Sequence, residues 1–191
     1  MSKIFLLLGG NKLNYGIVEK FRNKGYFVYV IDWNEHPQLT GDKHYQIDIK
    51  DTASIIDALK KDGVWENVHF AYSSIDLAVT SVARINRAIG LHTLTDEALQ
   101  YAASKSKMTE KWKELKLLNR YSVKSKCYLA EFYELAQQMK LIVKPDNSAS
   151  SRGITILQQG ADEDCCRAAY EKAKAEATNG LVVLEEFVEG T

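Results

Sequence analysis

The stretch Ile142-Val143-Lys144-Pro145-Asp146-Asn147-Ser148-Ala149-Ser150-Ser151-Arg152-Gly153 carries more structural information than any other part of this sequence. Its first four residues are typical of the end of an apolar strand, and Ile154–Leu157 alternates apolar and polar side chains as a second strand does. The residues between them are small and polar, apart from one arginine and a final glycine. A polyphosphate needs such a hairpin, because backbone N–H groups can close over it while fixed cations stand beside it. The stretch therefore predicts a phosphate-binding hairpin with Lys144 at its base.

Two further segments belong with this hairpin. Leu181-Val182-Val183-Leu184 predicts a third strand, which runs straight into Glu185-Glu186-Phe187-Val188-Glu189-Gly190. An extended edge of this kind can match adenine, which presents a hydrogen-bond donor next to an acceptor. Before the hairpin, Ser104-Lys105-Ser106-Lys107-Met108 places lysines at a helix start, where free N–H groups and the helix dipole favour a phosphate.

With these three segments, the chain resembles the ATP-grasp superfamily, in the branch of carbamoyl-phosphate synthase and the purine ligases. The family has an Asp-Lys-x-x-Met signature, of which Lys105 and Met108 are present while Ser104 replaces the aspartate. The resemblance covers nearly the whole chain. It implies an α/β fold with a Rossmann-like pre-ATP-grasp domain at 1–95, a helical connector at 96–120 and the α+β lid subdomain at 121–191, with the sequence ending before the catalytic subdomain.

The resemblance also implies a nucleotide site. Lys144 and its loop would contact the α- and β-phosphates, Lys105 would make a second phosphate contact, and Glu185 would accept a hydrogen bond from the adenine amino group. The implied nucleotide-binding residues are Lys105, Lys144, Ser150, Ser151, Arg152, Gly153, Glu185, Glu186 and Val188. The alternative for the charged residues is ordinary solvated surface charge, and Lys107 and Lys111 compete for the role of Lys105. The family's loop usually contains more glycines than this one.

The first 95 residues alternate between strand and helix patterns. Strands are predicted at 4–8, 27–31 and 68–72, and helices at 13–21, near 55–59 and at 75–89. This spacing is typical of parallel βαβ units. We therefore predict a small doubly wound domain.

The loops after these strands contain the candidate substrate residues. Gly9-Gly10 follows the first strand without the spaced glycines of a dinucleotide site, whereas Asp32 ends the second strand where a ribose-binding acid would lie. In the family this domain usually helps to hold the acceptor substrate, which implies roles for Gly10, Asn11, Asp32 and Asp76. For each of them the alternative is a turn or capping residue. Asp32 and Gly9-Gly10 also leave open an NAD-type Rossmann dinucleotide-binding protein.

The rest of the chain has a different pattern. Thr95-Asp96-Glu97-Ala98 predicts a helix start, and helical spacing continues to residue 118 with a break near 103–104, followed by a loop at 119–122. The predicted strands are 123–129, 141–144, 153–157 and 181–187, and the predicted helices are 131–139 and 162–177. This order predicts an α+β unit with an antiparallel sheet. Ile142 and Ile154 belong either to a purine-binding face or to the core.

Composition limits the function classes. The 191 residues include 25 Lys+Arg and 25 Asp+Glu, so the formal net charge of zero gives no reason to expect nucleic acid or an anionic membrane as a partner. No apolar run approaches the ~20 residues of a membrane span, and the apolar start is interpreted as a buried strand rather than a signal peptide. Cys127, Cys165 and Cys166 form no metal pattern and no disulfide framework, which favours the reducing cytosol.

Complete ATP-grasp enzymes activate a carboxylate as an acyl phosphate, which an amine or similar nucleophile then attacks. The resemblance implies ATP and a small carboxylate substrate as partners, with Mg²⁺ held only in a full-length enzyme by residues on later strands. We expect this chain alone to bind ATP weakly at best and not to turn it over. A non-catalytic nucleotide-binding regulatory module is the alternative. Because the lid normally faces a second half, we also expect an open face through which the chain can form a homo-oligomer.

Overall fold

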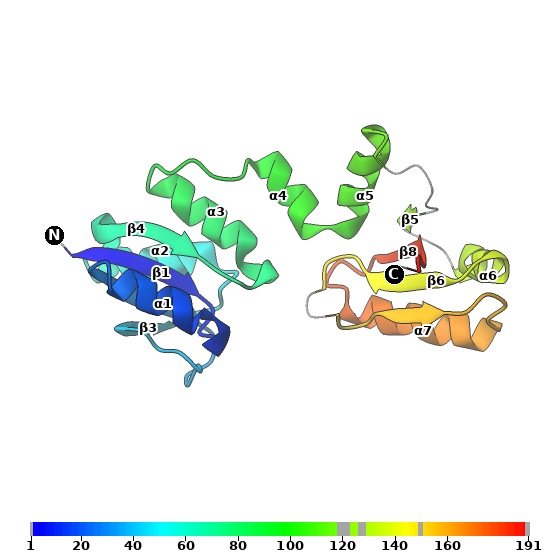
Figure 1. Cartoon of the computed structure of the whole chain (residues 1–191), viewed down its shortest axis with the longest axis horizontal. Coiled ribbons are helices and arrows are strands. Elements are labelled where there is room, and N and C mark those ends of the chain that lie inside the picture. Colours follow the sequence, from blue (N-terminus) through cyan, green and yellow to red (C-terminus); the bar gives the residue numbers. More distant parts are fainter. Residues whose placement is uncertain (1, 118–122, 126–128, 149–150, 190–191) are drawn as a thin grey trace. The chain divides into compact units, whose positions relative to one another are not determined.

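The chain folds into two compact units, Met1–Leu99 and Gln100–Thr191. The computed structural model describes residues 2–117, 123–125 (backbone only), 129–148 and 151–189, and Figure 1 shows their elements in sequence colours. The predicted loop at 119–122 lies outside the described residues. Among the helices within those ranges, none is both long and apolar enough to span a bilayer.

The first unit contains a four-stranded sheet with the order β3-β2-β1-β4, in which all neighbours run parallel. Its elements are β1 (Lys3–Leu8), η1 (Lys12–Asn14), α1 (Tyr15–Arg22), β2 (Tyr26–Asp32), β3 (Lys43–Gln46), α2 (Thr52–Lys61), η2 (Trp65–Asn67), β4 (Val68–Tyr72), η3 (Asp76–Ala78) and α3 (Val79–Ala88). The predicted α/β class is confirmed, and β3 is a strand that the sequence pattern did not predict.

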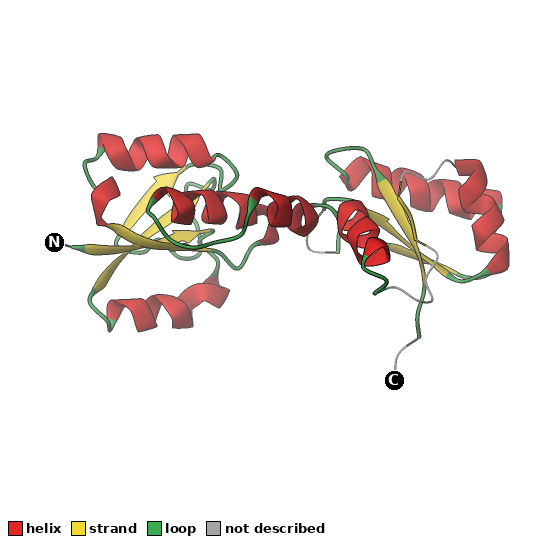
Figure 2. Cartoon of the chain, turned by 90° about the horizontal axis from the view of Figure 1, so that it is seen from above, coloured by secondary structure: helices red, strands yellow, loops and turns green. Residues whose placement is uncertain are grey.

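Helices cover both faces of this sheet, as Figure 2 shows. Since successive side chains of a strand point to opposite faces, β1 contributes to two cores. Ile4, Leu6 and Leu8 pack in one core with residues of α2 and α3, whereas Phe5 and Leu7 pack in another with Val18 of α1. A strand with an unbroken apolar run, such as Ile4–Leu8 of β1, belongs in such a doubly covered parallel sheet.

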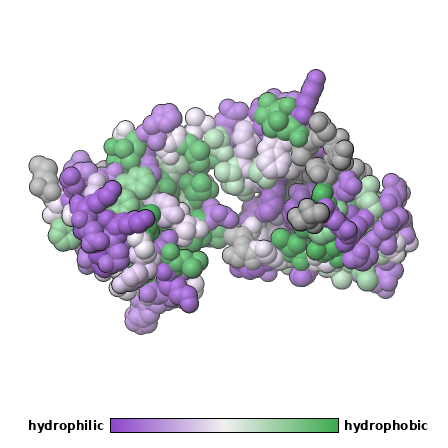
Figure 3. All heavy atoms as spheres, in the orientation of Figure 1, coloured by the Kyte–Doolittle hydropathy of each residue, from purple (hydrophilic) through white to green (hydrophobic). Residues whose placement is uncertain are grey.

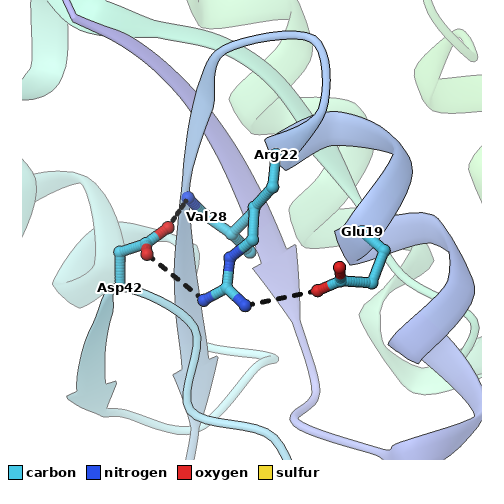
Figure 4. A network of polar contacts seen from close by, with 4 residues as sticks. All are labelled: Glu19, Arg22, Val28 and Asp42. Carbon is cyan, nitrogen blue, oxygen red and sulfur yellow. Dashed lines mark hydrogen bonds and ion pairs between the residues drawn. The ribbon is translucent and has the colours of Figure 1, made fainter.

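A network around Asp42 holds the start of β3 against β2 (Figure 4). The Asp42 carboxylate accepts the Val28 N–H at 2.6 Å and pairs with Arg22 of α1 at 3.2 Å. Arg22 also pairs with Glu19 at 3.5 Å. The preceding Gly41 has φ +67°, and a Cβ there would lie 2.4 Å from the Val28 carbonyl oxygen. This turn therefore requires glycine. The turn and the Asp42 contacts hold the edge strand β3, which has no alternating apolar pattern.

The second unit contains a four-stranded sheet with the order β5-β8-β6-β7, in which all neighbours run antiparallel, as predicted. Its elements are α5 (Lys105–Glu114), β5 (Val123–Ser125), α6 (Leu129–Gln138), β6 (Leu141–Pro145), β7 (Thr155–Leu157), α7 (Glu163–Glu176) and β8 (Val182–Glu186), and α4 (Asp96–Ala103) spans the division between the units. Phe132 and Ala136 of α6 and Ala169 and Ala173 of α7 cover one face of this sheet.

Several predicted boundaries are corrected by the structure. Leu129, predicted at the end of a strand, begins α6, and residues 126–128 of that strand lie outside the described residues. Gly153 and Ile154 precede β7 instead of belonging to it, because Gly153 has φ +72°. Leu13 lies in a short 3-10 helix with 80% of its surface exposed, so it is not on the buried face of α1.

The surface mixes polar and apolar residues. Figure 3 shows hydrophilic residues spread over the visible face, with apolar residues in separate patches between them.

Candidate functional site

Lys144 and Glu185 lie together on one face of the second sheet. In the antiparallel register Lys144 is opposite Val183 and Ile142 is opposite Glu185, so the two charged side chains are diagonal neighbours. The Lys144 ammonium is hydrogen-bonded to the Glu185 carboxylate. The side chains are 21% and 24% exposed. The implied phosphate-binding cation and the implied adenine acceptor are therefore in direct contact.

The same face carries two isoleucines. Ile142 is half-buried and pairs with Ile156 of β7, which is 47% exposed. These two residues, with Lys144 and Glu185, are here called the lysine face, which lies opposite the face covered by α6 and α7. The alternation of Thr155-Ile156-Leu157 could have identified Ile156, which the sequence reasoning missed in favour of Ile154.

Lys105 is held at the beginning of the hairpin loop. It is the first residue of α5, and its ammonium donates to the backbone carbonyls of Asp146 at 3.2 Å and Ser148 at 3.0 Å. Its own N–H donates to the Asp146 carbonyl at 3.1 Å. The helix N-terminus and the residue that follows Lys144-Pro145 are thus joined, and Lys105 lies at the start of the loop.

A buried carboxylate closes this junction. Asp146 is 1% exposed, and its oxygens accept the Ser106 N–H at 2.7 Å, the Ser104 hydroxyl at 2.9 and 3.1 Å and the Asn179 amide at 2.7 Å. Burial acts to raise the pKa of Asp146, but these hydrogen bonds outweigh it, so the pKa lies below its usual value. Sequence reasoning missed Asp146, because no local pattern links it to a helix start 40 residues earlier.

The end of the loop is fixed on α7. Arg152 lies 3.8 Å from the Glu176 carboxylate, and a Cβ on Gly153 would come within 3.0 Å of the Glu176 Cβ. Ser151 has a positive φ of 56°, which a non-glycine residue seldom adopts. Arg152 is thus placed beside an acid of α7. Ser150 lies outside the described residues.

The candidate adenine-reading residues lie at the end of β8. Phe187 donates its N–H to the Lys140 carbonyl at 2.9 Å, which continues the pairing with β6. In an extended chain the neighbouring residues, Glu186 and Val188, direct their backbone groups to the other side. Val188 is 54% exposed. Lys140 also pairs with Glu189 at 2.8 Å, and this hydrogen bond lowers the pKa of Glu189.

In the first unit, the candidate substrate residues follow the carboxyl ends of the strands. Gly10 and Asn11 follow β1, Asp32 ends β2, and exposed Asp76 follows β4. Ligands of open α/β sheets bind at this edge. The Asp32 carboxylate accepts the N–H groups of Gly10 at 2.7 Å and Asn34 at 2.9 Å, so both of its oxygens are used within the loops.

Asn11 also makes a local contact, since its side chain caps η1 by accepting the Leu13 N–H at 2.9 Å. Gly10 is closely packed: a Cβ there would lie 2.4 Å from the Leu39 carbonyl oxygen. In the ranges that the structure describes, no three His, Cys, Asp or Glu side chains gather as a metal site would require.

Comparison with solved structures shows which known proteins share this fold. The chain matches phosphoribosylglycinamide synthetase from Anaerococcus prevotii over its full length, with 22% identity and a TM-score of 0.60, and an L-amino acid ligase from Bacillus licheniformis over 99% of its length, with 17% identity and a TM-score of 0.71. It has the fold of the N-terminal half of ATP-grasp enzymes. An ADP complex of the ATP-grasp enzyme N5-carboxyaminoimidazole ribonucleotide synthetase matches 98% of the chain, with 15% identity and a TM-score of 0.71.

The chain spans about half the length of these ATP-grasp structures, namely 47%, 45% and 47% of the three matched chains. No protein-family model matches the sequence, and no curated protein does. The likeness therefore lies in the three-dimensional arrangement of the elements. It confirms the fold class and the resemblance on which the site assignments depend.

Proposed function

We propose that residues 100–191 bind ATP and form the ATP-binding portion of an ATP-grasp ligase, which activates a carboxylate as an acyl phosphate for attack by an amine or similar nucleophile. The observation that carries the proposal is the contact between Lys144 and Glu185 on the lysine face. Lys144 offers a cation to the anionic phosphates of ATP, and Glu185 offers an acceptor to the adenine amino group.

Each group of the site has a part in this proposal. Lys144 contributes positive charge to the α- and β-phosphates, and Glu185 accepts a hydrogen bond from the adenine amino group. Ile142 and Ile156 offer apolar surface to the purine ring. Loop N–H groups, Arg152 and Lys105 surround the phosphates, and the backbone groups of residues 186 and 188 read the adenine edge. We assign Mg²⁺ only to a full-length enzyme.

The first unit would help to hold the acceptor substrate at the carboxyl edge of its parallel sheet. The proposed contacts are Gly10, Asn11, Asp32 and Asp76. What supports them is their position at this edge, where three loops meet after β1, β2 and β4. The side chains of Asp32 and Asn11 accept hydrogen bonds from nearby backbone N–H groups. They would keep these bonds, which hold the loops, and also contact the substrate.

Isothermal titration calorimetry tests nucleotide binding. The 191-residue chain is titrated with ATP, GTP and NADH, and ATP is expected to bind most tightly. Lys144→Ala should weaken ATP binding at least tenfold, which is the effect of roughly 1.4 kcal/mol from a lost charge-assisted contact. Lys174→Ala is the matched control, because Lys174 is an exposed lysine on α7, which covers the opposite face of the sheet.

Glu185→Ala separates base recognition from charge. The variant should reduce the preference for ATP over GTP, because guanine carries an oxygen where adenine has its amino group. Equal affinities of the Lys144→Ala and Lys174→Ala chains would refute the phosphate role of Lys144. Tighter binding of NADH than of ATP would support the dinucleotide alternative, and phosphate release above that of Lys144→Ala would refute the expectation that this chain does not turn ATP over.

A further inference from the structure

We propose that Asp146 is the positioning residue of the nucleotide site, which sets Lys105 and the start of the hairpin loop in one arrangement by capping α5 from the neighbouring sheet. The proposal concerns a residue to which the resemblance assigned no role. It deepens the proposed function, on which its nucleotide-binding consequence rests.

The acid near Lys105 lies at a different position in this chain from that in the family signature. The Asp-Lys-x-x-Met signature has its aspartate at position 104, and this chain has serine there. The Ser104 side chain caps α5 by accepting the Lys107 N–H at 3.2 Å, and its hydroxyl donates to Asp146. A carboxylate from the end of β6 thus stands at the helix N-terminus, where negative charge is favourable.

Hydrogen bonds from three residues converge on the Asp146 carboxylate. A buried carboxylate is tolerated only when its oxygens are satisfied, and Asp146 receives the Ser106 N–H, the Ser104 hydroxyl and the Asn179 amide. These donors come from two segments distant in sequence, the start of α5 and the turn before β8. Asp146 is therefore a three-way junction between β6, α5 and β8.

Lys105 is bonded to the backbone at the same junction. The Lys105 N–H and ammonium both donate to the Asp146 carbonyl, and the ammonium also donates to the Ser148 carbonyl. Because Ser104 and Ser106 flank Lys105 and both bond to the Asp146 carboxylate, the backbone of Lys105 cannot move independently of Asp146. The position of the Lys105 ammonium follows from the cap.

The first measurement needs no nucleotide. Lys105 amine reactivity is followed by reductive methylation and mass spectrometry, with exposed Lys20 as internal reference. Asp146→Asn should label Lys105 at least threefold faster than the wild-type chain, since it removes the charge that holds α5 to the loop. Asp162→Ser is the control: Asp162 caps α7 by accepting the Cys165 N–H at 2.7 Å, away from the loop. Labelling of Lys105 at the wild-type rate in Asp146→Asn would overturn the proposal.

The second measurement is rescue. Ser104→Asp combined with Asp146→Ser returns the acid to the helix start and should restore slow labelling of Lys105, a result that loss of stability alone would not give. If Asp146→Asn does not fold, Ser104→Ala and Asn179→Ala each remove one side-chain donor to Asp146 and keep the carboxylate. Faster labelling of Lys105 in both supports the proposal, and unchanged labelling in both overturns it.

The third measurement is affinity. ATP binding should weaken roughly tenfold in Asp146→Asn, as expected from one charge-assisted hydrogen bond, and recover in the rescued chain. Wild-type chain that binds no ATP would refute the proposed function, while the labelling result would still decide the role of Asp146. Tight ATP binding by wild type that Asp146→Asn leaves unchanged would overturn the positioning role alone.

Discussion

At the scale of single residues, the structure separates glycines that the fold requires from those it tolerates. A Cβ on Gly10 would lie 2.4 Å from the Leu39 carbonyl oxygen and 2.6 Å from the Pro37 Cβ, whereas one on Gly16 would meet nothing within 4 Å. Gly10 also donates its N–H to Asp32, so a shift of its backbone would disturb the acid as well. The close approach of two loops depends on the missing side chain.

Gly10→Ala is therefore expected to lower the free energy of unfolding by about 1–3 kcal/mol, the usual effect of forced overpacking. Gly16→Ala, in helix α1, should instead leave stability unchanged or raise it by up to about 1 kcal/mol, because alanine is the better helix former. Urea titration followed by circular dichroism measures both. Equal stabilities of the two variants would contradict the packing around Gly10.

Asp146 gives a second prediction at this scale, on pH. Its folded pKa is lowered, so its stabilising contribution is present above the unfolded pKa of about 3.9 and is lost as pH falls through the folded value. Asp146→Asn should be about 1–3 kcal/mol less stable than wild type at pH 7. The difference should shrink as pH falls below ~4, because the carboxyl of the unfolded chain then binds a proton before the carboxyl of the folded wild-type chain does. Urea titrations from pH 7 to pH 3 measure it, and a constant difference would contradict the assignment.

At the scale of elements, Asn86 compensates for the position of β4 at the edge of the first sheet. This buried side chain of α3 accepts the Ala71 N–H at 2.8 Å and donates to the Ala71 carbonyl at 2.9 Å. It supplies both hydrogen bonds that a further strand would supply. A side chain from a helix thus terminates the sheet, and α3 is fixed to the strand before it.

Asn86→Leu should leave both backbone groups of Ala71 buried without partners, at a cost of about 1–3 kcal/mol for each. Arg84→Ala, which changes an exposed residue of the same helix, should alter stability by less than about 0.5 kcal/mol. Hydrogen exchange at the Ala71 amide measures the effect directly. Exchange in Asn86→Leu as slow as in Arg84→Ala would show that another group satisfies this edge.

The elements also show what sequence patterns can predict. The break at 103–104 was predicted, and Ser104 there caps α5. β1 was predicted because its apolar run has no polar interruption. β3 was not predicted, because Lys43–Gln46 is a short edge strand without apolar alternation, held by the turn at Gly41 and the carboxylate of Asp42. Local patterns reveal elements with a buried face, but not those fixed by polar contacts.

At the scale of the whole molecule, local sequence patterns also predict only part of the candidate site. Lys105, Lys144 and Glu185 were identified from short motifs and a family resemblance. The residues that contact them were not identified, because the contacts join distant parts of the sequence. Lys144 bonds to Glu185, 41 positions later, and Ser106 bonds to Asp146, 40 positions later. Such pairs depend on strand register and on where a helix begins, which follow from the packing of the complete unit. The comparison with ATP-grasp structures confirms the fold, while the roles of the residues stay predictions.

The division into two units, each with its own core, leads to the last prediction. A ligand that binds only the folded second unit stabilises that unit by about 2.7 kcal/mol at 100 times its Kd. ATP should therefore slow hydrogen exchange about 100-fold for the core amides of β6 and β8, if these exchange through unfolding of the unit. Those of β1 should not change, since Phe5 and Leu7 belong to the other unit. Lys144→Ala should abolish the effect at the same ATP concentration, and equal slowing in β1 would show that the units unfold as one.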